Sequence, residues 1–522
     1  MKKIIKYIPM LLGLALTNQA CTDDFEEINT PSNAVTTVNP AYFINTMQLG
    51  VVENYQRNVN LYADFYAQYW SNTVESFGSP RYEYRNDWVG NQWKEHYSGQ
   101  LRKSLAIKEQ FGDNALYSNI NAINEIWICY WWSRMTDFYG DIPYFKAGEG
   151  EAVPYNSQEE IYDDLFKRLD QAVNNLKDND ESQAKLNKYD LMYQDDIAKW
   201  KRFANSLRLR LAMRLSNIAP DKAKIQFAAA MTNGVMQSNA DNAEVPIYSK
   251  GWNDYLHQMA WNWDNIRVSK TFTNHLYNIS TVGEDPRTPI WLCYKVDGKS
   301  TTKEDAGKKA YEGLENGYSA TNMPANKLSR ATINLKGGYK GFSGDGEGSD
   351  NLMYVPVMFY SEVLFLQSEA ALRGWIAGNA DDLYKKGIQA SMDLVGVPSA
   401  KAEEYLSGIK ALNGSNEAKL KQIISQKWIA NFPNGVEAWA DFRRTDYPDI
   451  TLPVDGVSGN ASVAANTWVK RIRYPDNQHN LNQANMPASL NTVDKDRMDV
   501  KVWWDVAGTE SKNNEGLMSS NF

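Results

Sequence analysis

Two neighbouring segments of the chain carry apolar residues at three- and four-residue steps, the spacing of amphipathic helices. The first, residues 157–177, begins with Ser157 and has Glu160 three positions later, a capping box that marks a helix start. The second carries apolar side chains on one face and arginines on another. Its apolar face consists of Ile197, Trp200, Ala204, Leu207, Leu211 and Leu215, and its basic face of Arg202, Arg210 and Arg214. Together the two segments predict a helical hairpin.

The same spacing returns in the second half of the chain. Residues 360–371 and 383–394 predict another helical pair, separated by a stop at residues 374–379. A further helix at residues 424–432 is halted by Pro-Asn-Gly at residues 433–435. No strict 34-residue sequence repeat is present, but paired helices of this length are typical of tetratricopeptide-like stacks. The pattern therefore predicts an all-α fold with a tetratricopeptide-like helical-hairpin scaffold.

Four segments between and after these helices have a different composition. They are rich in Gly, Asn, Asp, Pro and Ser, with Trp and Tyr interspersed, and they span residues 78–94, 241–266, 297–350 and 445–522. Long irregular segments inside a compact protein are usually functional or disordered. Their aromatic content argues against disorder, because the rings can bury apolar area. We therefore expect a large irregular, loop-built ligand-binding face on the helical scaffold.

The first twenty residues have the pattern of a secretory signal. Three lysines precede an apolar run at residues 7–16, which is shorter than the roughly 20 residues that span a bilayer. Cys21 follows a small residue, which favours a lipoprotein signal with Cys21 acylated. Asn18 and Gln19 depart from the residues usual before such a cysteine, so ordinary cleavage that leaves a free thiol stays open. We expect a signal peptide at residues 1–20.

Residues 21–40 predict a lipidated acidic tether, because acidic side chains gather between positions 23 and 27 and prolines follow. No later window reaches the length of a membrane span, so acyl chains on Cys21 would hold the protein at a membrane. The binding domain, a helical scaffold with loop insertions, is then expected at residues 41–522.

Composition and charge narrow the classes of function. The chain has 522 residues and a net charge of −8, which becomes −11 when Lys2, Lys3 and Lys6 leave with the signal. This acidic balance lacks the basic footprint of nucleic-acid binding, so no nucleic-acid partner is expected. The chain also contains 17 Trp and 30 Tyr, a surplus that suits a large core or a surface of flat amphipathic rings.

Motifs of known catalytic chemistry are absent from the sequence. The histidines, His96, His257, His275 and His479, fall at no metal-ligand spacing, and no G-x-S-x-G elbow occurs. Residues 344–348 (Gly-Asp-Gly-Glu-Gly) resemble a phosphate loop superficially and are interpreted as a turn. Their acidic side chains could hold calcium, although the spacing is not that of an EF-hand. No cofactor and no metal site are expected.

A carboxylate pair for glycoside cleavage is the remaining enzymatic option. Glu362 and Glu369 share a predicted helix face but lie about 10.5 Å apart along its axis, beyond the roughly 5–9.5 Å of glycosidase pairs. Arg373 lies four residues after Glu369, so a local ion pair explains Glu369. Other acidic pairs that converge only in three dimensions stay open. We expect a protein that is not an enzyme.

The cysteines agree with export. Cys129 lies in an apolar run and is expected to be a buried thiol. A Cys129–Cys293 disulfide stays open as the alternative.

The tryptophans are the best candidates for ligand contacts. Those at helical positions are expected in the core: Trp127, Trp131, Trp200, Trp428 and Trp439. Those in loop-like or extended segments, with one neighbouring amide, are the predicted ligand-binding residues: Trp88, Trp93, Trp252, Trp261, Asn262, Trp263 and Trp291. Sugars have an apolar C–H face and a polar rim, so each ring could contribute about 1 kcal/mol, and three rings roughly a millimolar Kd. The alternative is that these rings only pin the loops to the scaffold.

Six short stretches, in order along the chain, resemble the SusD/RagB family of outer-membrane nutrient-binding lipoproteins. They are residues 132–144, 199–210, 360–371, 426–444, 473–475 and 502–505. Cys21 and the acidic run after it match the family's start, and this run also resembles a surface-export signal of Bacteroidota lipoproteins. Each stretch alone is modest, but the ordered set covers essentially the whole mature chain.

The resemblance implies a helical body with tetratricopeptide-like repeats, a ligand-binding face, and a place on the cell surface at the outer membrane. It implies a non-catalytic receptor that binds glycans (oligosaccharides) and delivers them to a TonB-dependent, SusC/RagA-type transporter, with the receptor as its lid. Peptide cargo in the same role is the first alternative, and a secreted all-helical glycosidase is the second. Since the family motifs are mostly scaffold, Arg443 and Arg444, with Asp441 nearby, are expected to form a structural ion pair. Gly140 is expected to end a helix.

Overall fold

The computed structural model describes residues 39–53, 55–150, 152–248, 256, 258–334, 352–456, 459–506 and 521–522. Several predictions fall outside these residues, namely those on residues 1–20, Cys21, the tether up to residue 38, Trp252, His257 and residues 344–348. Residues 40–522 belong to one packed unit. In the described part of this unit, no helix is both long and apolar enough to cross a bilayer.

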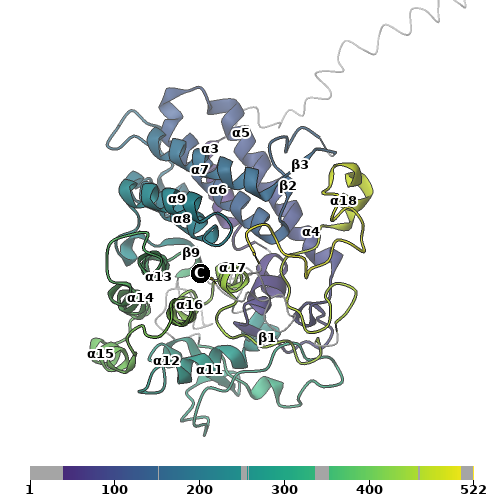
Figure 1. The fold of residues 1–522 in the computed structure, drawn as a ribbon, viewed down its shortest axis with the longest axis vertical. Helices are drawn as coiled ribbons and strands as arrows, with labels where there is room; N and C mark the ends of the chain where they lie inside the picture. Colours follow the sequence, from purple (N-terminus) through teal and green to yellow (C-terminus); the bar gives the residue numbers. More distant parts are fainter. Residues whose placement is uncertain are drawn as a thin grey trace, which may run out of the picture. The chain divides into compact units, whose positions relative to one another are not determined.

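The first group of helices forms the upper part of the unit in Figure 1. Its members are α3 (Pro40–Leu49), α4 (Asn86–Lys94), α5 (Arg102–Phe111), α6 (Ser118–Tyr139), α7 (Gln158–Asn175), α8 (Ile197–Arg214) and α9 (Pro220–Asn233). Two wider π-helical stretches, η1 (Gln56–Asp64) and η3 (Glu95–Leu101), pack against α4. The predicted helices at residues 157–177 and 197–215 are therefore present as α7 and α8. These two helices touch each other, but α7 packs mainly on α6 and α8 mainly on α9.

Local signals fix where these helices begin and end. The Ser157 hydroxyl accepts a hydrogen bond from the Glu160 backbone N–H at 3.2 Å, and the Glu160 carboxylate accepts one from the Ser157 N–H at 3.0 Å. This reciprocal pair is the predicted capping box. α6 ends at Gly140, whose φ of 81° is a conformation that glycine adopts without steric penalty. Both predicted boundaries are confirmed.

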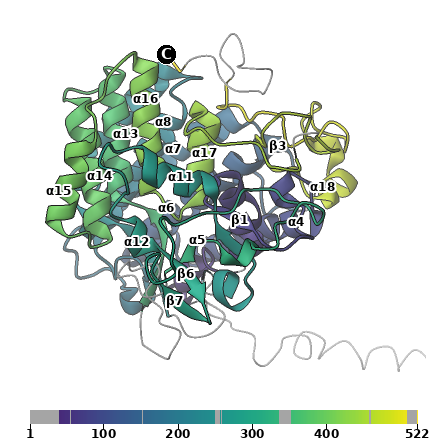
Figure 2. The same cartoon turned by 90° about the horizontal axis from the view of Figure 1, so that it is seen from below.

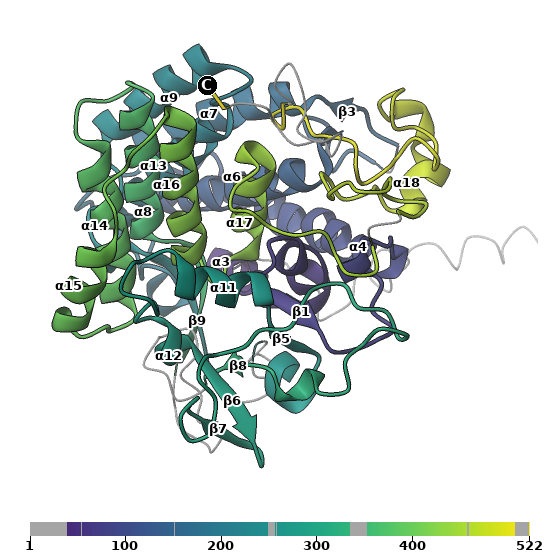
Figure 3. The same cartoon turned by 60° about the horizontal axis from the view of Figure 1, so that its bottom comes forward.

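The second group of helices continues the scaffold. Its members are α11 (Lys270–Asn278), α12 (Thr288–Trp291), α13 (Tyr360–Leu372), α14 (Ala380–Leu394), α15 (Ser399–Gly408), α16 (Asn416–Ala430), α17 (Gly435–Thr445) and α18 (Asp476–Leu481). Figures 2 and 3 show α13, α14, α15 and α16 side by side, and α13 also packs on α8, which joins the two groups. The predicted pair at residues 360–371 and 383–394 is α13 with α14. The helical scaffold is confirmed.

Short strands occur between the helices. Their bounds are β1 (Trp70–Asn72), β2 (Ile142–Pro143), β3 (Tyr155–Asn156), β4 (Ala243–Tyr248), β5 (Ile266–Val268), β6 (Leu292–Val296), β7 (Lys299–Thr301), β8 (Thr332–Ile333) and β9 (Leu352–Met358). They pair antiparallel as β1–β5, β2–β3, β4–β9 and β7–β6–β8. Figure 3 shows β6, β7 and β8 below α11, amid loops. These strands and loops make up the loop-built face.

The core contains the tryptophans that the sequence assigned to it. Trp127, Trp131, Trp200, Trp428 and Trp439 are all less than 2% exposed. The cysteine alternative is wrong, because Cys129 and Cys293 are separate buried thiols. Burial raises the pKa of Cys129 to about 12 and that of Cys293 to about 11, so both stay protonated and unreactive at neutral pH.

A network of buried ion pairs ties the helices of the scaffold together. Arg210 of α8 binds Glu362 of α13 through two hydrogen bonds, of 2.8 and 2.7 Å. One α8 turn later, Arg214 binds Glu437 of α17 at 2.7 Å. Of the three arginines that the sequence placed on a second face of α8, Arg210 and Arg214 thus lie inside the protein, because α13 and α17 supply carboxylates there. Arg202 is 33% exposed and pairs with Asp241 instead. We call these pairs, with Glu369 and its partners, the buried ion network.

Glu369 of α13 lies between two arginines. Its carboxylate accepts hydrogen bonds from Arg444 at 2.7 Å and from Arg373 at 2.9 Å. Burial alone would raise the pKa of Glu369, but the charges of Arg444 and Arg373 and their hydrogen bonds lower it to about 2. The predicted ion pair with Arg373 is confirmed, and Arg444, which also lies 3.6 Å from Asp441, is structural. Glu362 and Glu369 are therefore held by different arginines in the dry interior.

Candidate ligand-binding site

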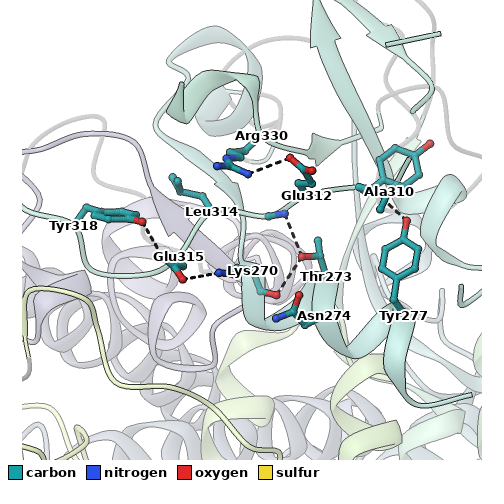
Figure 4. A pocket seen from close by; sticks show the side chains of 12 residues that line it. Lys270, Thr273, Asn274, Tyr277, Ala310, Glu312, Leu314, Glu315, Tyr318 and Arg330 are labelled. Atoms are coloured by element: carbon teal, nitrogen blue, oxygen red, sulfur yellow. Dashed lines mark hydrogen bonds and ion pairs between the residues drawn. The ribbon is translucent and has the colours of Figure 1, made fainter. Parts of the chain in front are cut away.

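A pocket of about 440 Å³ opens on the loop-built face between α11 and the segment 310–318 (Figure 4). Its size lies in the range of small-ligand sites. Tyrosines and charged side chains dominate the lining, which includes Lys270, Thr273, Asn274, Tyr277, Tyr311, Glu312, Glu315, Tyr318 and Arg330. We call it the tyrosine pocket.

Backbone pairing holds the segment 310–318 against α11. The Lys270 N–H donates to the Leu314 carbonyl at 2.8 Å, and the Leu314 N–H donates to the Val268 carbonyl at 2.8 Å. Gly313 makes this approach feasible, since a Cβ there would lie 2.3 Å from the Ser269 carbonyl oxygen. The pairing buries Leu314 and leaves Glu312 and Glu315 exposed at the pocket. The loop thereby presents two carboxylates on a rigid support.

Each carboxylate of the pocket has a cationic partner. Glu315 accepts from the Lys270 ammonium at 2.7 Å and from the Tyr318 hydroxyl at 2.8 Å. Glu312 accepts from the Arg330 guanidinium at 3.2 Å. The hydrogen bond from Lys270, followed by that from Tyr318, lowers the pKa of Glu315. Partial burial and the neighbouring Glu315 raise the pKa of Tyr318 to about 12, so at neutral pH the phenol donates and the carboxylate accepts.

Tyrosine rings form the walls around these charges. Figure 4 shows Tyr318 and Tyr277 on opposite sides of the pocket, with Lys270, Thr273 and Asn274 between them. The Tyr277 hydroxyl donates to Glu284 at 3.0 Å and accepts from the Tyr311 N–H at 3.0 Å, which fixes its ring. Tyr277 and Tyr318 are half-buried, whereas Tyr311 is buried. Two ring faces separated by hydrogen-bonding groups match a ligand with an apolar face and a polar rim.

Trp88, one of the predicted ligand residues, lies on α4 and contacts the segment 77–85, which reaches the Tyr318 loop of this pocket. Its half-buried ring meets Phe77 edge-on at 5.6 Å, with the Arg85 guanidinium 5.3 Å from its centre. The guanidinium of Arg81 donates to the carbonyls of Phe77 and Tyr318, at 2.9 and 3.2 Å. The structure thus brings the segment 77–88 and the Tyr318 loop together.

Trp263 and Asn262 are exposed, as the sequence predicted. The Trp263 side chain is 43% exposed, and the Asn262 amide donates to Gln258 at 3.0 Å. The next residue, Asp264, is held by Arg267 and Lys295 at 2.8 and 2.7 Å. This ring is therefore presented on a fixed turn at the surface.

Three predicted ligand-binding rings are buried, so the expectation that they face a ligand is wrong for them. Trp93 lies on α4 and packs on Tyr97 at 4.8 Å and on Tyr139 at 5.1 Å. Trp261 is 8% exposed, and its indole N–H donates to the Ile333 carbonyl at 3.0 Å. Trp291, on α12, is 1% exposed against Phe272 and Phe432. These three rings belong to the hydrophobic core instead.

The tyrosines and ion pairs of the pocket were not among the predicted ligand-binding residues. The predicted rings were all tryptophans, although Tyr311 and Tyr318 lie in the Gly- and Asn-rich segment 297–350 that was expected to form part of the loop-built face. The surplus of tyrosine over phenylalanine was the signal that could have found them. No group of three or more His, Cys, Asp or Glu side chains suited to a metal ion occurs among the residues that the structure describes.

The SusD-like family model, described as "Starch-binding associating with outer membrane", matches residues 32–475. A comparison with curated proteins gives no match.

Solved structures resemble the chain over nearly its whole length. A structure described as a chitin-binding protein is 28% identical, covers 90% of this chain and 100% of its own, and has a TM-score of 0.74. A chitin-binding SusD homologue from Flavobacterium johnsoniae is 27% identical, with 91% and 98% of the two chains covered and a TM-score of 0.72. A SusD homologue from Parabacteroides distasonis is also 27% identical, with 90% and 98% covered and a TM-score of 0.76.

Proposed function

The chain belongs to the SusD-like family, and from that membership we propose that it is a non-catalytic cell-surface receptor that binds oligosaccharides at the tyrosine pocket. The family description, starch-binding and associated with the outer membrane, supports glycan binding as the general activity. The structures named as chitin-binding support amino-sugar oligosaccharides as the first cargo to test.

The observation that carries this proposal is the Lys270–Glu315–Tyr318 arrangement beside the Tyr277 ring. Glu315 is an ionised acceptor, Lys270 and Tyr318 are donors, and the rings on either side can cover the C–H faces of a sugar. The ion pairs of the pocket are about half-exposed, with side-chain exposures of 52% for Lys270 and 45% for Glu315. Exposed pairs contribute roughly 0–1 kcal/mol, so sugar hydroxyls can replace them at little loss.

Weak binding of this kind suits a protein that hands its ligand on. Two ring contacts of about 1 kcal/mol each, with hydrogen bonds to ionised groups, give roughly millimolar affinity before ordering losses. We propose that the recipient is a TonB-dependent, SusC/RagA-type transporter and that the helical scaffold docks on it. We also propose that residues 1–20 are removed and that acylated Cys21 anchors the acidic tether in the outer membrane. Co-purification in mild detergent should then recover a large β-barrel partner.

Isothermal titration with chito-, malto- and cello-oligosaccharides tests the binding. The wild-type protein should bind at least one series, and Glu315→Ala should weaken that binding about tenfold, because the central acceptor is lost. Glu404→Ala is the matched control, since Glu404 also forms an exposed pair with a lysine, Lys401 on α15. Equal affinities for the Glu315 variant and the wild type would remove the pocket from the proposal.

Two further assays separate the alternatives. If peptides are the cargo, a peptide mixture should displace bound oligosaccharide or bind where no sugar does. If the protein is a glycosidase, incubation with polysaccharide should release reducing ends. We expect no release, because Glu362 and Glu369 are buried and bound by arginines.

A further inference from the structure

A second groove lies in the part of the scaffold formed by α5, α6 and α7. Its volume is about 710 Å³, larger than that of the tyrosine pocket. In Figure 1, α5, α6 and α7 lie in the upper part of the unit, whereas α11, which lines the tyrosine pocket, lies at the bottom. The side chains that carry the argument are Lys108, Asn121, Glu125, Arg168, Gln171 and Asn175. We call this the polar groove.

The walls of the polar groove are held rigidly. The Asn121 amide of α6 donates to the Phe111 carbonyl at 2.8 Å, and the Ser118 hydroxyl donates to the Asn175 carbonyl of α7 at 2.9 Å. Phe111 and Tyr117 stack at 4.3 Å with an interplanar angle of 27°, at the two ends of the loop that closes one side. Sites on helices keep their geometry better than sites on free loops.

The charges of the groove are balanced and oriented. Glu125 is bound by Lys108 at 2.6 Å and by Arg168. Burial alone would raise the pKa of Glu125, but the charges of Arg168 and Lys108 lower it, so the carboxylate stays ionised at neutral pH. Arg168 also donates to the Tyr144 hydroxyl at 2.6 Å through Nη1, and its Nη2 makes no hydrogen bond with the described residues. With Asp113 included, the lining carries equal numbers of positive and negative groups.

The remaining polar groups of the groove are carboxamides and a hydroxyl. Gln171 and Asn175 are exposed, and within the described part of the chain their side chains form no hydrogen bond. Each carboxamide has a donor and an acceptor side by side, which matches the paired donor and acceptor roles of a sugar hydroxyl. A balanced lining of this kind disfavours a charged ligand, because any net charge would lose hydration without a net counter-charge.

We propose that the polar groove is a second glycan-binding site for a neutral, polyhydroxylated chain, with Arg168, Gln171 and Asn175 as its contacts. This inference rests on the proposed function for the class of ligand. A receptor with two separated sites holds a long polysaccharide at both, and linked binding raises avidity by roughly 10²–10⁴ when one chain spans the sites. Short oligosaccharides occupy each site independently.

The test compares chitobiose, which can fill one site at a time, with long chitin chains. Wild-type protein should bind chitobiose at two sites by isothermal titration. In Tyr318→Ala, which alters the tyrosine pocket, only the site in the polar groove should remain. In the double variant Gln171→Ala/Asn175→Ala, only the site in the tyrosine pocket should remain. The retention of each variant on a chitin column should be at least tenfold weaker than that of the wild type. Asn174→Ala is the matched control on α7, because Asn174 is exposed and does not line the groove.

Hydrogen exchange gives a second measurement that does not depend on tight binding. Chitobiose should slow exchange in residues 111–122 and 168–175 of the wild type but not of the double variant. If the wild type binds chitobiose at only one site and the double variant binds it equally well, the second site is excluded. The proposed function would still hold. No binding of any oligosaccharide at either site would overturn the proposed function and this inference together.

Discussion

The buried ion network of the scaffold and the ion pairs of the tyrosine pocket use the same groups in opposite surroundings. Arg444 and Glu369 are each 1% exposed, whereas Lys270 and Glu315 are about half-exposed. In the scaffold each charge is buried away from water and is stabilised only by its ion-pair and hydrogen-bond partners. In the pocket each charge keeps its hydration and is free to exchange partners. Solvent access, rather than residue type, thus separates a structural ion pair from one that can receive a ligand.

Removing one buried carboxylate and one exposed carboxylate should give the largest contrast. Glu369→Ala leaves Arg444 and Arg373 buried without their main counter-charge, so the free energy of unfolding should fall by about 3–5 kcal/mol. Urea denaturation followed by circular dichroism measures it. Glu404→Ala, which removes an exposed partner of Lys401, should change stability by less than about 0.5 kcal/mol. Equal losses in the two variants would contradict the comparison.

Asp64 is a buried carboxylate that the network does not neutralise. It lies on η1, accepts from the Asn60 amide at 3.2 Å, and forms no ion pair with any described residue. Gly435, at the start of α17, approaches so closely that a Cβ there would lie 2.2 Å from Asp64 Oδ1. Burial raises the pKa of Asp64 to about 7, above its value in the unfolded chain.

The folded protein therefore binds more protons than the unfolded chain between about pH 4 and 7, and the contribution of Asp64 to stability is lost as pH rises through 7. Asp64→Asn should remove this loss. The difference in unfolding free energy between variant and wild type should shift by roughly 2 kcal/mol in favour of the variant from pH 5 to pH 8. Denaturant titrations at both pH values measure it. If the difference in unfolding free energy is the same at pH 5 and pH 8, Asp64 is ionised at both pH values.

Tyr318 should matter for binding and little for folding. Tyr318→Ala removes one ring wall and the phenol donor to Glu315, so affinity for oligosaccharide at the tyrosine pocket should fall about tenfold. The free energy of unfolding should change by less than about 1 kcal/mol, because the side chain is half-exposed. Titration and urea denaturation of the same preparation separate the two effects. A loss of stability that matches the loss of affinity would place Tyr318 with the scaffold instead.

Trp263 gives the smallest expected effect. Trp263→Ala should weaken oligosaccharide binding about threefold if the ring extends the binding face, with stability unchanged within about 0.5 kcal/mol. Phe145→Ala is the control, since Phe145 is 54% exposed on the turn after β2 and lines neither the pocket nor the groove. Identical affinities for both variants would confine ligand contacts to the tyrosine pocket and Trp88.

The scaffold was predictable because its signals are local. The capping box at Ser157, the apolar spacing of α13 and the stop at Gly140 lie within a few residues of the boundaries they set. The ion-pair partners of Arg210 and Arg214 were not predictable, because Glu362 and Glu437 lie 152 and 223 positions away in the sequence. Sequence spacing shows a face of a helix, but it does not show which other helix covers that face.

The candidate site was harder to predict for the same reason. Lys270 and Glu315 are 45 positions apart and meet only because the segment 310–318 pairs with α11. Trp261 and Trp263 are two positions apart, yet one is 8% and the other 43% exposed. Composition indicated that rings would bind, but only the tertiary pairing decides which rings reach the surface.

A crystal structure with a chito-oligosaccharide of four units would show whether sugar rings bind between Tyr277 and Tyr318. A sugar ring should lie in the tyrosine pocket, with a hydroxyl within hydrogen-bonding distance of Glu315. An oligosaccharide bound elsewhere at saturating concentration, with the tyrosine pocket empty and open to solvent, would contradict binding between these tyrosines.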